Sequence, residues 1–183
     1  MRFQRRKAST DGEETQSKYN AKKSILHVDT GNLVRVSAKE LAVFKAISYV
    51  PEQHIIFDSE LEAKYYRDIL LPRVRAGKIK VEFQPKFTLL PKQEKDGIKH
   101  MAITYSPDFA IIREGRKTVY VDVKGAEDQK FPLKRKMFDA AFPDFPPLVV
   151  MKYAKKFGGW VTFEVWTEKK RAENKAKKAS VSQ

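Results

Sequence analysis

The chain contains no cysteine among its 183 residues, so disulfide bonds and thiolate metal sites are excluded. The absence of cysteine is compatible with a reducing compartment. No apolar run approaches the roughly 20 residues that a membrane helix needs. The first residues, MRFQRRKASTDGEETQ, lack the apolar segment of a signal peptide. We therefore expect a cytoplasmic protein with no membrane partner.

Several sequence signatures of function are also missing. The chain has no internal repeat, no phosphate-binding loop, no dinucleotide fingerprint and no serine-nucleophile pattern. Its three histidines, His27, His54 and His100, are isolated and lack the spacing of metal ligands, so we expect structural or surface roles for them. These absences exclude the commonest nucleotide-binding and acyl-transfer sites.

Positive charge is abundant, with a formal net charge of +14. Residues 1–23 contain seven Lys/Arg and three Asp/Glu, and residues 168–183 contain six and two, so the excess extends into the body of the chain. A basic body with basic ends favours a polyanionic partner such as nucleic acid. The alternative is a surface that serves only solubility.

The order of helical and extended patterns predicts an α/β (mixed α+β) protein with a mixed central sheet flanked by helices. We expect basic flexible tails at residues 1–23 and 168–183, an N-terminal hairpin and helix at 24–53, and one main domain at 54–167. Capping-box spacing at Ser37/Glu40 and Ser59/Glu62 marks the starts of two helices. PKQEKDGIKH is expected to be a polar turn, and WVTFEVWT a strand with core aromatics.

The segment SPDFAIIREGRKTVYVDVKG, residues 106–125, predicts a hairpin. A three-residue loop at 114–116 pairs Arg113 with Lys117, and in that register Asp108 lies opposite Asp122. A two-residue loop would shift the register and separate the acids. Two facing carboxylates destabilise a sheet unless a cation lies between them, and a divalent cation with oxygen ligands is the natural one.

Side-chain alternation on the second strand of this hairpin separates two faces. The valines at 119, 121 and 123 face the core, whereas Asp122 and Lys124 project together on the other face. Gly125 ends the strand and would let a substrate backbone approach. Taken alone, an Asp-x-Lys pattern is more often an ordinary salt bridge at a strand end.

Several segments together carry a family resemblance. FDSELEAKYYRDILL, FQPKFTL, ITYSPDFAI, VYVDVKG and FPLKRKMFDAAFP occur in this order between about residues 54 and 167. The set resembles the PD-(D/E)xK nuclease superfamily, whose motif would be Pro107, Asp108, Asp122 and Lys124. It is most similar to a phage-associated branch known mainly as a domain of unknown function.

The resemblance implies a restriction-endonuclease-like core and roles for individual residues. Asp108, Asp122 and the Val123 carbonyl would bind Mg²⁺, with Mn²⁺ as a substitute, and Lys124 would position or deprotonate the attacking water. The branch pattern adds Glu62 as a catalytic ligand, although Ser59/Glu62 is equally a helix cap. Gln84 would either align the site or hydrogen-bond at a strand edge.

The expected activity is metal-dependent endonucleolytic hydrolysis of DNA in phage or prophage recombination, replication or processing, in a bacterial host cell. A junction-resolving, structure-selective activity fits small basic members of the superfamily. DNA contacts are expected from Gln84, Lys134, Arg135 and Lys130, although Lys134 and Arg135 are equally suited to face solvent. A homodimer would suit cutting two strands. The alternatives are a non-catalytic DNA-binding accessory protein on a nuclease fold and an RNA nuclease.

Overall fold

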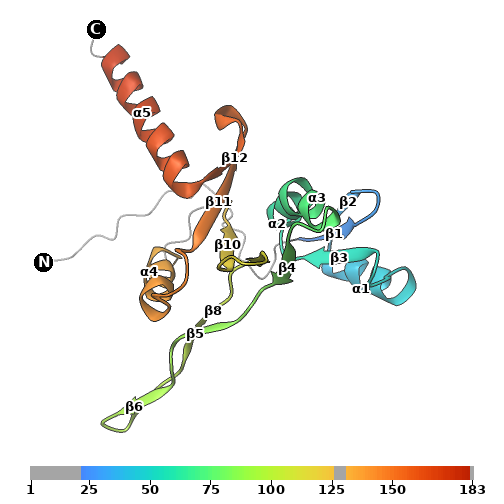
Figure 1. The fold of residues 1–183 in the computed structure, drawn as a ribbon, viewed down its shortest axis with the longest axis horizontal. Helices are drawn as coiled ribbons and strands as arrows, with labels where there is room; N and C mark the ends of the chain where they lie inside the picture. Colours follow the sequence, from blue (N-terminus) through green and yellow to red (C-terminus); the bar gives the residue numbers. More distant parts are fainter. Residues whose placement is uncertain (1–21, 126–130, 182–183) are drawn as a thin grey trace, which may run out of the picture.

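A mixed five-stranded sheet lies at the centre of the computed structural model, which describes residues 22–125 and 131–181 (Figure 1). The strand order is β12-β11-β10-β9-β4. β10 and β11 are parallel, and the other neighbours are antiparallel. The strands are β4 (Lys80–Phe83), β9 (Phe109–Ile112), β10 (Val119–Val123), β11 (Val149–Ala154) and β12 (Gly159–Thr162). The expected mixed α+β class is confirmed.

The β9–β10 hairpin has the expected register, with Val119 opposite Ile111 and Val121 opposite Phe109. Its loop is closed by a turn in which the Arg116 amide donates to the Arg113 carbonyl. Gly115 adopts the left-handed conformation there, which costs glycine little. The same register brings positions 108 and 122 to the open end of the hairpin.

A second, antiparallel sheet forms the N-terminal part of the chain. Its strands are β1 (Lys23–His27), β2 (Leu33–Val36) and β3 (His54–Phe57), in the order β2-β1-β3. α1 (Ala38–Ile47) follows β2 and starts with a complete capping box between Ser37 and Glu40. The predicted hairpin and helix are confirmed. Because β3 pairs with β1, the predicted boundary between residues 53 and 54 falls inside one sheet.

One helical segment lies between the two sheets and packs on both. It comprises α2 (Glu60–Tyr65), the π-helical turn η2 (Tyr66–Leu70) and α3 (Leu71–Arg75). Pro72 has no N–H to donate, and the Leu71 amide bonds to the Tyr66 carbonyl in the wide π pattern. Ala63 and Leu70 are fully buried in the main core with Val121 and Val123.

A long two-stranded arm projects from the body (Figure 1). Its base is β5 (Phe87–Leu90) paired with β8 (Ile103–Tyr105), and its end is β6 (Gln93–Lys95) paired with β7 (Ile98–His100). The expectation of a polar turn at PKQEKDGIKH is therefore wrong. α4 (Phe131–Ala141) packs beside the arm's base through Phe138 and Phe87. Leu133 of the same helix is 63% exposed.

The C-terminal segment is helical where a strand and a tail were expected. After the 3₁₀ turn η3 (Lys155–Phe157) and β12, the helix α5 (Phe163–Val181) begins and projects away from the sheet (Figure 1). Phe163 and Trp166, one helical turn apart, stack with ring centroids 6.0 Å apart. Strand alternation beyond Thr162 was therefore wrong. The predicted tail at 1–23 lies outside the described residues up to position 21.

Candidate active site

Asp122 is the buried centre of the site, with only 1% of the residue exposed. Its Oδ1 accepts a hydrogen bond of 2.8 Å from the hydroxyl of Tyr105, at the end of β8. Its Oδ2 lies 2.6 Å from Nζ of Lys124. The Lys124 ammonium also lies 5.0 Å from the ring centroid of Phe131. Lys124, the residue after β10, therefore lies on the same side as Asp122, as alternation predicted.

Asp108 closes the hairpin end beside Asp122. Its Oδ2 accepts a 2.7 Å hydrogen bond from the Val123 amide, so its carboxylate lies across the end of β10. Its carbonyl accepts a 3.0 Å bond from the Gln84 amide. Gln84 has a φ of +47°, a left-handed conformation that is uncommon for a non-glycine residue and is concentrated at functional sites.

Glu62 approaches the two aspartates from the first turn of α2. The Ser59 side chain caps that helix by accepting from the Glu62 amide, and its hydroxyl donates to Glu62 Oε1 at 2.7 Å. The Glu62 carboxylate is therefore held by a hydroxyl, whereas the Glu40 carboxylate of α1 accepts from the backbone amide of Ser37. Ser59 thus acts as a cap and also as a partner for the candidate ligand.

Gly125 explains how α2 comes so close to the end of β10. A Cβ at Gly125 would lie 2.9 Å from Cδ1 of Leu61, closer than real Cβ contacts, so the end of the Leu61 side chain would have to shift. The absence of a side chain therefore makes room for Leu61, the residue before Glu62. The expected role of Gly125 was access for substrate, and its contact in the structure is with the α2 helix.

The acids and the lysine shift one another's pKa. Burial, together with the charges of Asp122 and Glu62, raises the pKa of Asp108 to about 8. Burial also raises the pKa of Glu62, helped by Asp58 and Asp122 and opposed by Ser59 and Lys124. For Lys124, burial lowers the pKa, but the nearby carboxylates outweigh it and the net shift is upward. Lys124 therefore stays protonated beside these acids.

The donor set suits a hard divalent cation. Three partly or fully buried carboxyl groups face one ammonium, so ionising all of them leaves uncompensated negative charge. The oxygens of Asp108 and Asp122 and the carbonyl of Val123 are the ligand type that Mg²⁺ prefers. Within residues 22–125 and 131–181, however, no three His, Asp or Glu side chains form a ready metal cage. Glu62, whose Oε1 accepts from the Ser59 hydroxyl, is the third carboxyl group at this edge of the sheet.

Comparison with known proteins places the chain in a protein family. The model of the family described as "Protein of unknown function (DUF1064)" matches residues 43–158, well over half of the chain. The chain belongs to this family. No curated protein and no solved structure gives a significant match. The DUF1064 region contains Glu62, Asp108, Asp122 and Lys124, and it ends before α5.

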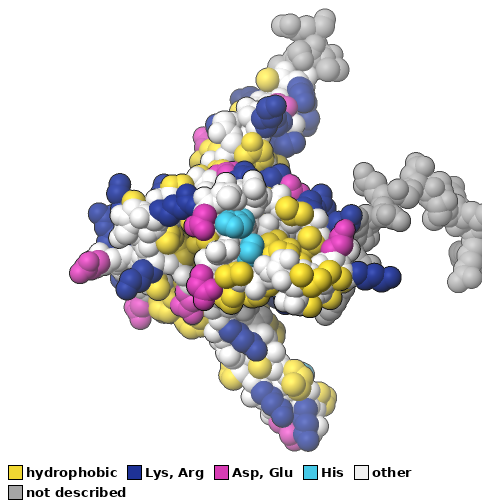
Figure 2. Space-filling view, turned by 90° about the vertical axis from the view of Figure 1, so that its right-hand side faces the viewer, with side chains coloured by type: hydrophobic (Ala, Val, Ile, Leu, Met, Phe, Trp, Pro, Cys, Tyr) yellow, Lys and Arg dark blue, Asp and Glu magenta, His cyan; other side chains and the backbone are white. Residues whose placement is uncertain are grey.

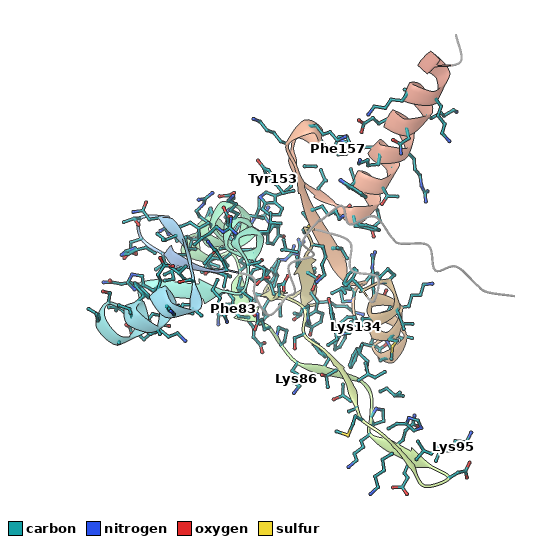
Figure 3. All side chains as sticks on the ribbon, turned by 180° about the vertical axis from the view of Figure 1, so that it is seen from behind. Phe83, Lys86, Lys95, Lys134, Tyr153 and Phe157 are labelled. Atoms are coloured by element: carbon teal, nitrogen blue, oxygen red, sulfur yellow. The ribbon has the colours of Figure 1, made fainter. Side chains whose placement is uncertain are left out.

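The candidate DNA-binding residues of this DUF1064 protein have different environments. Gln84 lies at the site, and its side-chain amide donates to Asp58 Oδ2 at 3.0 Å. Arg135 forms a 2.6 Å ion pair with Glu164 of α5, which lies outside the family region. Lys134 is half-buried on α4 and is labelled in Figure 3. Lys130 lies outside the described residues.

Sequence reasoning missed Tyr105 and Asp58. A buried tyrosine hydroxyl needs a hydrogen-bond partner, so a tyrosine ending the strand before Pro107 and Asp108 was a usable signal. Asp58 binds Lys23 at 2.8 Å as well as Gln84, and so ties the first strand to the edge of the site. No sequence pattern marked Asp58.

Within the described part of the chain, no helix is both long and apolar enough to cross a bilayer.

Proposed function

We propose that this protein is a Mg²⁺-dependent DNA endonuclease of the PD-(D/E)xK superfamily, with a restriction-endonuclease-like core. The observation that carries the proposal is the pairing at the end of β10. Asp108 bonds to the Val123 amide and Asp122 is paired with Lys124, so two acids and one lysine meet at adjacent strand ends. The resemblance of the ordered sequence segments supports the same class.

Each residue has a role that follows from its surroundings. Asp108, Asp122 and the carbonyl of Val123 would hold the metal, with Glu62 as a further ligand. The bound ion would supply Lewis-acid activation of water and charge neutralisation at the phosphate. Lys124, held beside Asp122 at 2.6 Å, orients the attacking water and stabilises the negative charge that develops on the phosphoryl oxygens.

Tyr105 and Gly125 act through the ligands. The Tyr105 hydroxyl fixes one oxygen of Asp122 and leaves the other directed toward Lys124. Gly125 allows Leu61, and with it Glu62, to come close to the end of β10. The proposed setting is phage or prophage DNA processing in the cytoplasm of a bacterial host.

A substrate panel tests the proposal. Linear duplex, nicked duplex, flap, single strand, four-way junction and a matched RNA are incubated with Mg²⁺, with Mn²⁺ or with EDTA. We expect metal-dependent cleavage of at least one DNA by the wild type, and loss of cleavage in Asp108→Ala, Asp122→Ala and Lys124→Ala. Lys45→Ala, an exposed lysine on α1, is the matched control and should cleave normally.

Three results would redirect the proposal. Cleavage retained in Asp122→Ala, after contamination is excluded, would remove the assigned site. DNA binding without any cleavage would favour the non-catalytic accessory protein. Preferential cleavage of RNA would assign the same site to an RNA nuclease.

A further inference from the structure

The arm, defined as residues 86–105, projects farther from the sheet than any core packing requires. Residues 91–104 are all exposed, and Figure 1 shows the arm pointing away from both sheets. Leu90 pairs with Ile103, Gln93 with His100 and Lys95 with Ile98, so the two strands form an antiparallel ribbon, with one register shift near its base between Thr88 and Leu90. An isolated two-stranded ribbon is marginal in water and contributes little to folding. Folding stability therefore does not explain the length of the arm, and we expect the arm to have a function in binding.

The sequence fixes the shape of this ribbon. Asp96 and Gly97 have φ values of +51° and +79°, the two positive values of a type I′ hairpin turn, for which Asp-Gly is a preferred pair. At the other end, Leu89 and Tyr105 are buried in a cluster with Phe138 and Leu148. A locally encoded turn and a buried base give the arm a defined direction.

The arm begins at the candidate active site. Tyr105, its last residue, donates to Asp122, and Gln84, two residues before it, donates its amide to the Asp108 carbonyl. The base of the arm therefore adjoins the two carboxylates. From Tyr105 to Gly97 the ribbon spans about 26 Å at about 3.3 Å per residue. This length corresponds to about 8 base pairs of duplex at about 3.4 Å each.

The arm carries more positive than negative charge. Lys86, Lys92, Lys95 and Lys99 outnumber Glu94 and Asp96. Figure 3 labels Lys86 at the base and Lys95 near the tip, and dark blue side chains follow the downward-pointing arm in Figure 2. None of these four lysines forms an ion pair within the described ranges, although Lys99 lies opposite Glu94 in the register. Their ammonium groups are available to phosphates.

We infer that the arm is a DNA-binding ribbon that holds the duplex flanking the scissile phosphate. A two-stranded β-ribbon fits the major groove of B-DNA, and lysines along it would contact the phosphates on the groove walls. The inference rests on the proposed function, because DNA is the substrate assigned to the adjoining site. To that function the inference adds two points: the arm is the element that binds the substrate, and the duplex enters the active site from the side of the sheet on which the arm lies.

A second copy of the chain is the other candidate occupant, and the composition of the arm disfavours it. Ile98 and Met101 are 63% and 74% exposed, but an odd separation places them on opposite faces of the ribbon, and Ile103, on the face of Met101, is only 36% exposed. Isolated apolar residues do not make the continuous patch of a stable interface. Lysines along the ribbon would also repel the same lysines of a second arm, as charged edges do in natural sheets.

Neutralising the exposed lysines of the arm tests the inference. The arm variant carries Lys92→Ala, Lys95→Ala and Lys99→Ala. The control variant, Lys39→Ala, Lys45→Ala and Lys78→Ala, loses the same charge at exposed positions on α1 and after α3. Binding to a fluorescein-labelled duplex of about 30 base pairs and to a four-way junction is measured by anisotropy, in EDTA, over a series of salt concentrations.

We expect the arm variant to bind about tenfold or more weakly, with a log affinity–log salt slope reduced by about 2–3, because about one counterion is released per contact. The control should stay within about threefold of the wild type. Circular dichroism and thermal unfolding should be unchanged, since none of the three lysines contacts the core.

Several outcomes would overturn the inference. Equal binding by the arm variant and the wild type would overturn it while leaving the proposed nuclease intact. Equal weakening in the control would attribute the effect to net charge alone. A wild-type dimer that the arm variant converts to a monomer, with DNA affinity retained, would assign the arm to a second copy. A wild type that binds no DNA would overturn the inference, and a wild type that also cleaves no DNA of the substrate panel with Mg²⁺ would remove the proposed function.

Discussion

Replacing Asp108 with asparagine should stabilise the protein at neutral pH when divalent cations are removed. Burial and the charges of Asp122 and Glu62 raise the pKa of the Asp108 carboxyl from 3.8 to about 8 in the folded protein. A raised carboxyl pKa means that the folded state binds a proton which the unfolded state has released. The contribution of the Asp108 carboxyl to the free energy of unfolding is therefore complete below about pH 4. It is lost as the pH rises toward about 8.

The size of the effect follows from the two pKa values. At pH 7 the difference corresponds to about 4 kcal/mol of destabilisation. Asparagine removes the titration and keeps an oxygen that can accept from the Val123 amide. Its amide NH₂ also becomes partly buried, which costs about 1–3 kcal/mol when it lacks a partner. We therefore expect a net gain of about 1–3 kcal/mol in the free energy of unfolding.

Urea unfolding in EDTA, followed by tryptophan fluorescence between about pH 4 and pH 8, measures this difference. The wild type should lose stability relative to the variant as the pH rises. Near pH 4 the variant should be less stable by the cost of its buried NH₂, about 1–3 kcal/mol, and the two curves should cross between about pH 4 and pH 7. Saturating Mg²⁺ should then stabilise the wild type more than Asp108→Asn. A variant less stable than the wild type at every pH would refute the electrostatic account of the site.

Three further predictions concern the residues around the carboxylates. Tyr105→Phe should lower the free energy of unfolding by about 1–3 kcal/mol and slow cleavage, because buried Asp122 loses a donor; unchanged urea midpoint and rate would contradict this. Gly125→Ala should slow cleavage, since its Cβ would lie 2.9 Å from Leu61 Cδ1, and adding Leu61→Ala should restore part of the rate; no restoration in steady-state kinetics would discount that contact. Lys134→Ala should weaken DNA binding more than Arg135→Ala, because Arg135 is already paired with Glu164; the reverse order in anisotropy would contradict it.

The hairpin of the site could be predicted because two local rules agreed. Alternation placed the valines of β10 in the core, and the register placed Asp108 opposite Asp122. The structure has this core face, and the same register as far as the pair Val121–Phe109, next to Asp108 and Asp122; its loop is longer than three residues. Helix starts at Ser37 and Ser59 were equally readable from cap spacing. The spacing could not predict which group hydrogen-bonds to the Glu62 carboxylate, because that depends on the orientation of the Ser59 hydroxyl.

The arm and the last helix were missed for different reasons. Asp96-Gly97 is a preferred hairpin-turn pair, but the flanking residues alternate weakly because both faces of the arm meet solvent. In α5, Phe163 and Trp166 fit helical spacing, yet the β-branched residues around them favoured a strand. Tertiary packing against β11 and β12 decides that segment.

The most direct test of the central claim is cleavage of a supercoiled plasmid by the wild type and by Asp122→Asn, each with Mg²⁺ and with EDTA. We predict nicked or linear product only for the wild type with Mg²⁺. The rate should fall at least about 100-fold in the variant or in EDTA. Equal cleavage by both proteins, or cleavage that persists in EDTA, would contradict a metal-dependent nuclease site at Asp108, Asp122 and Lys124.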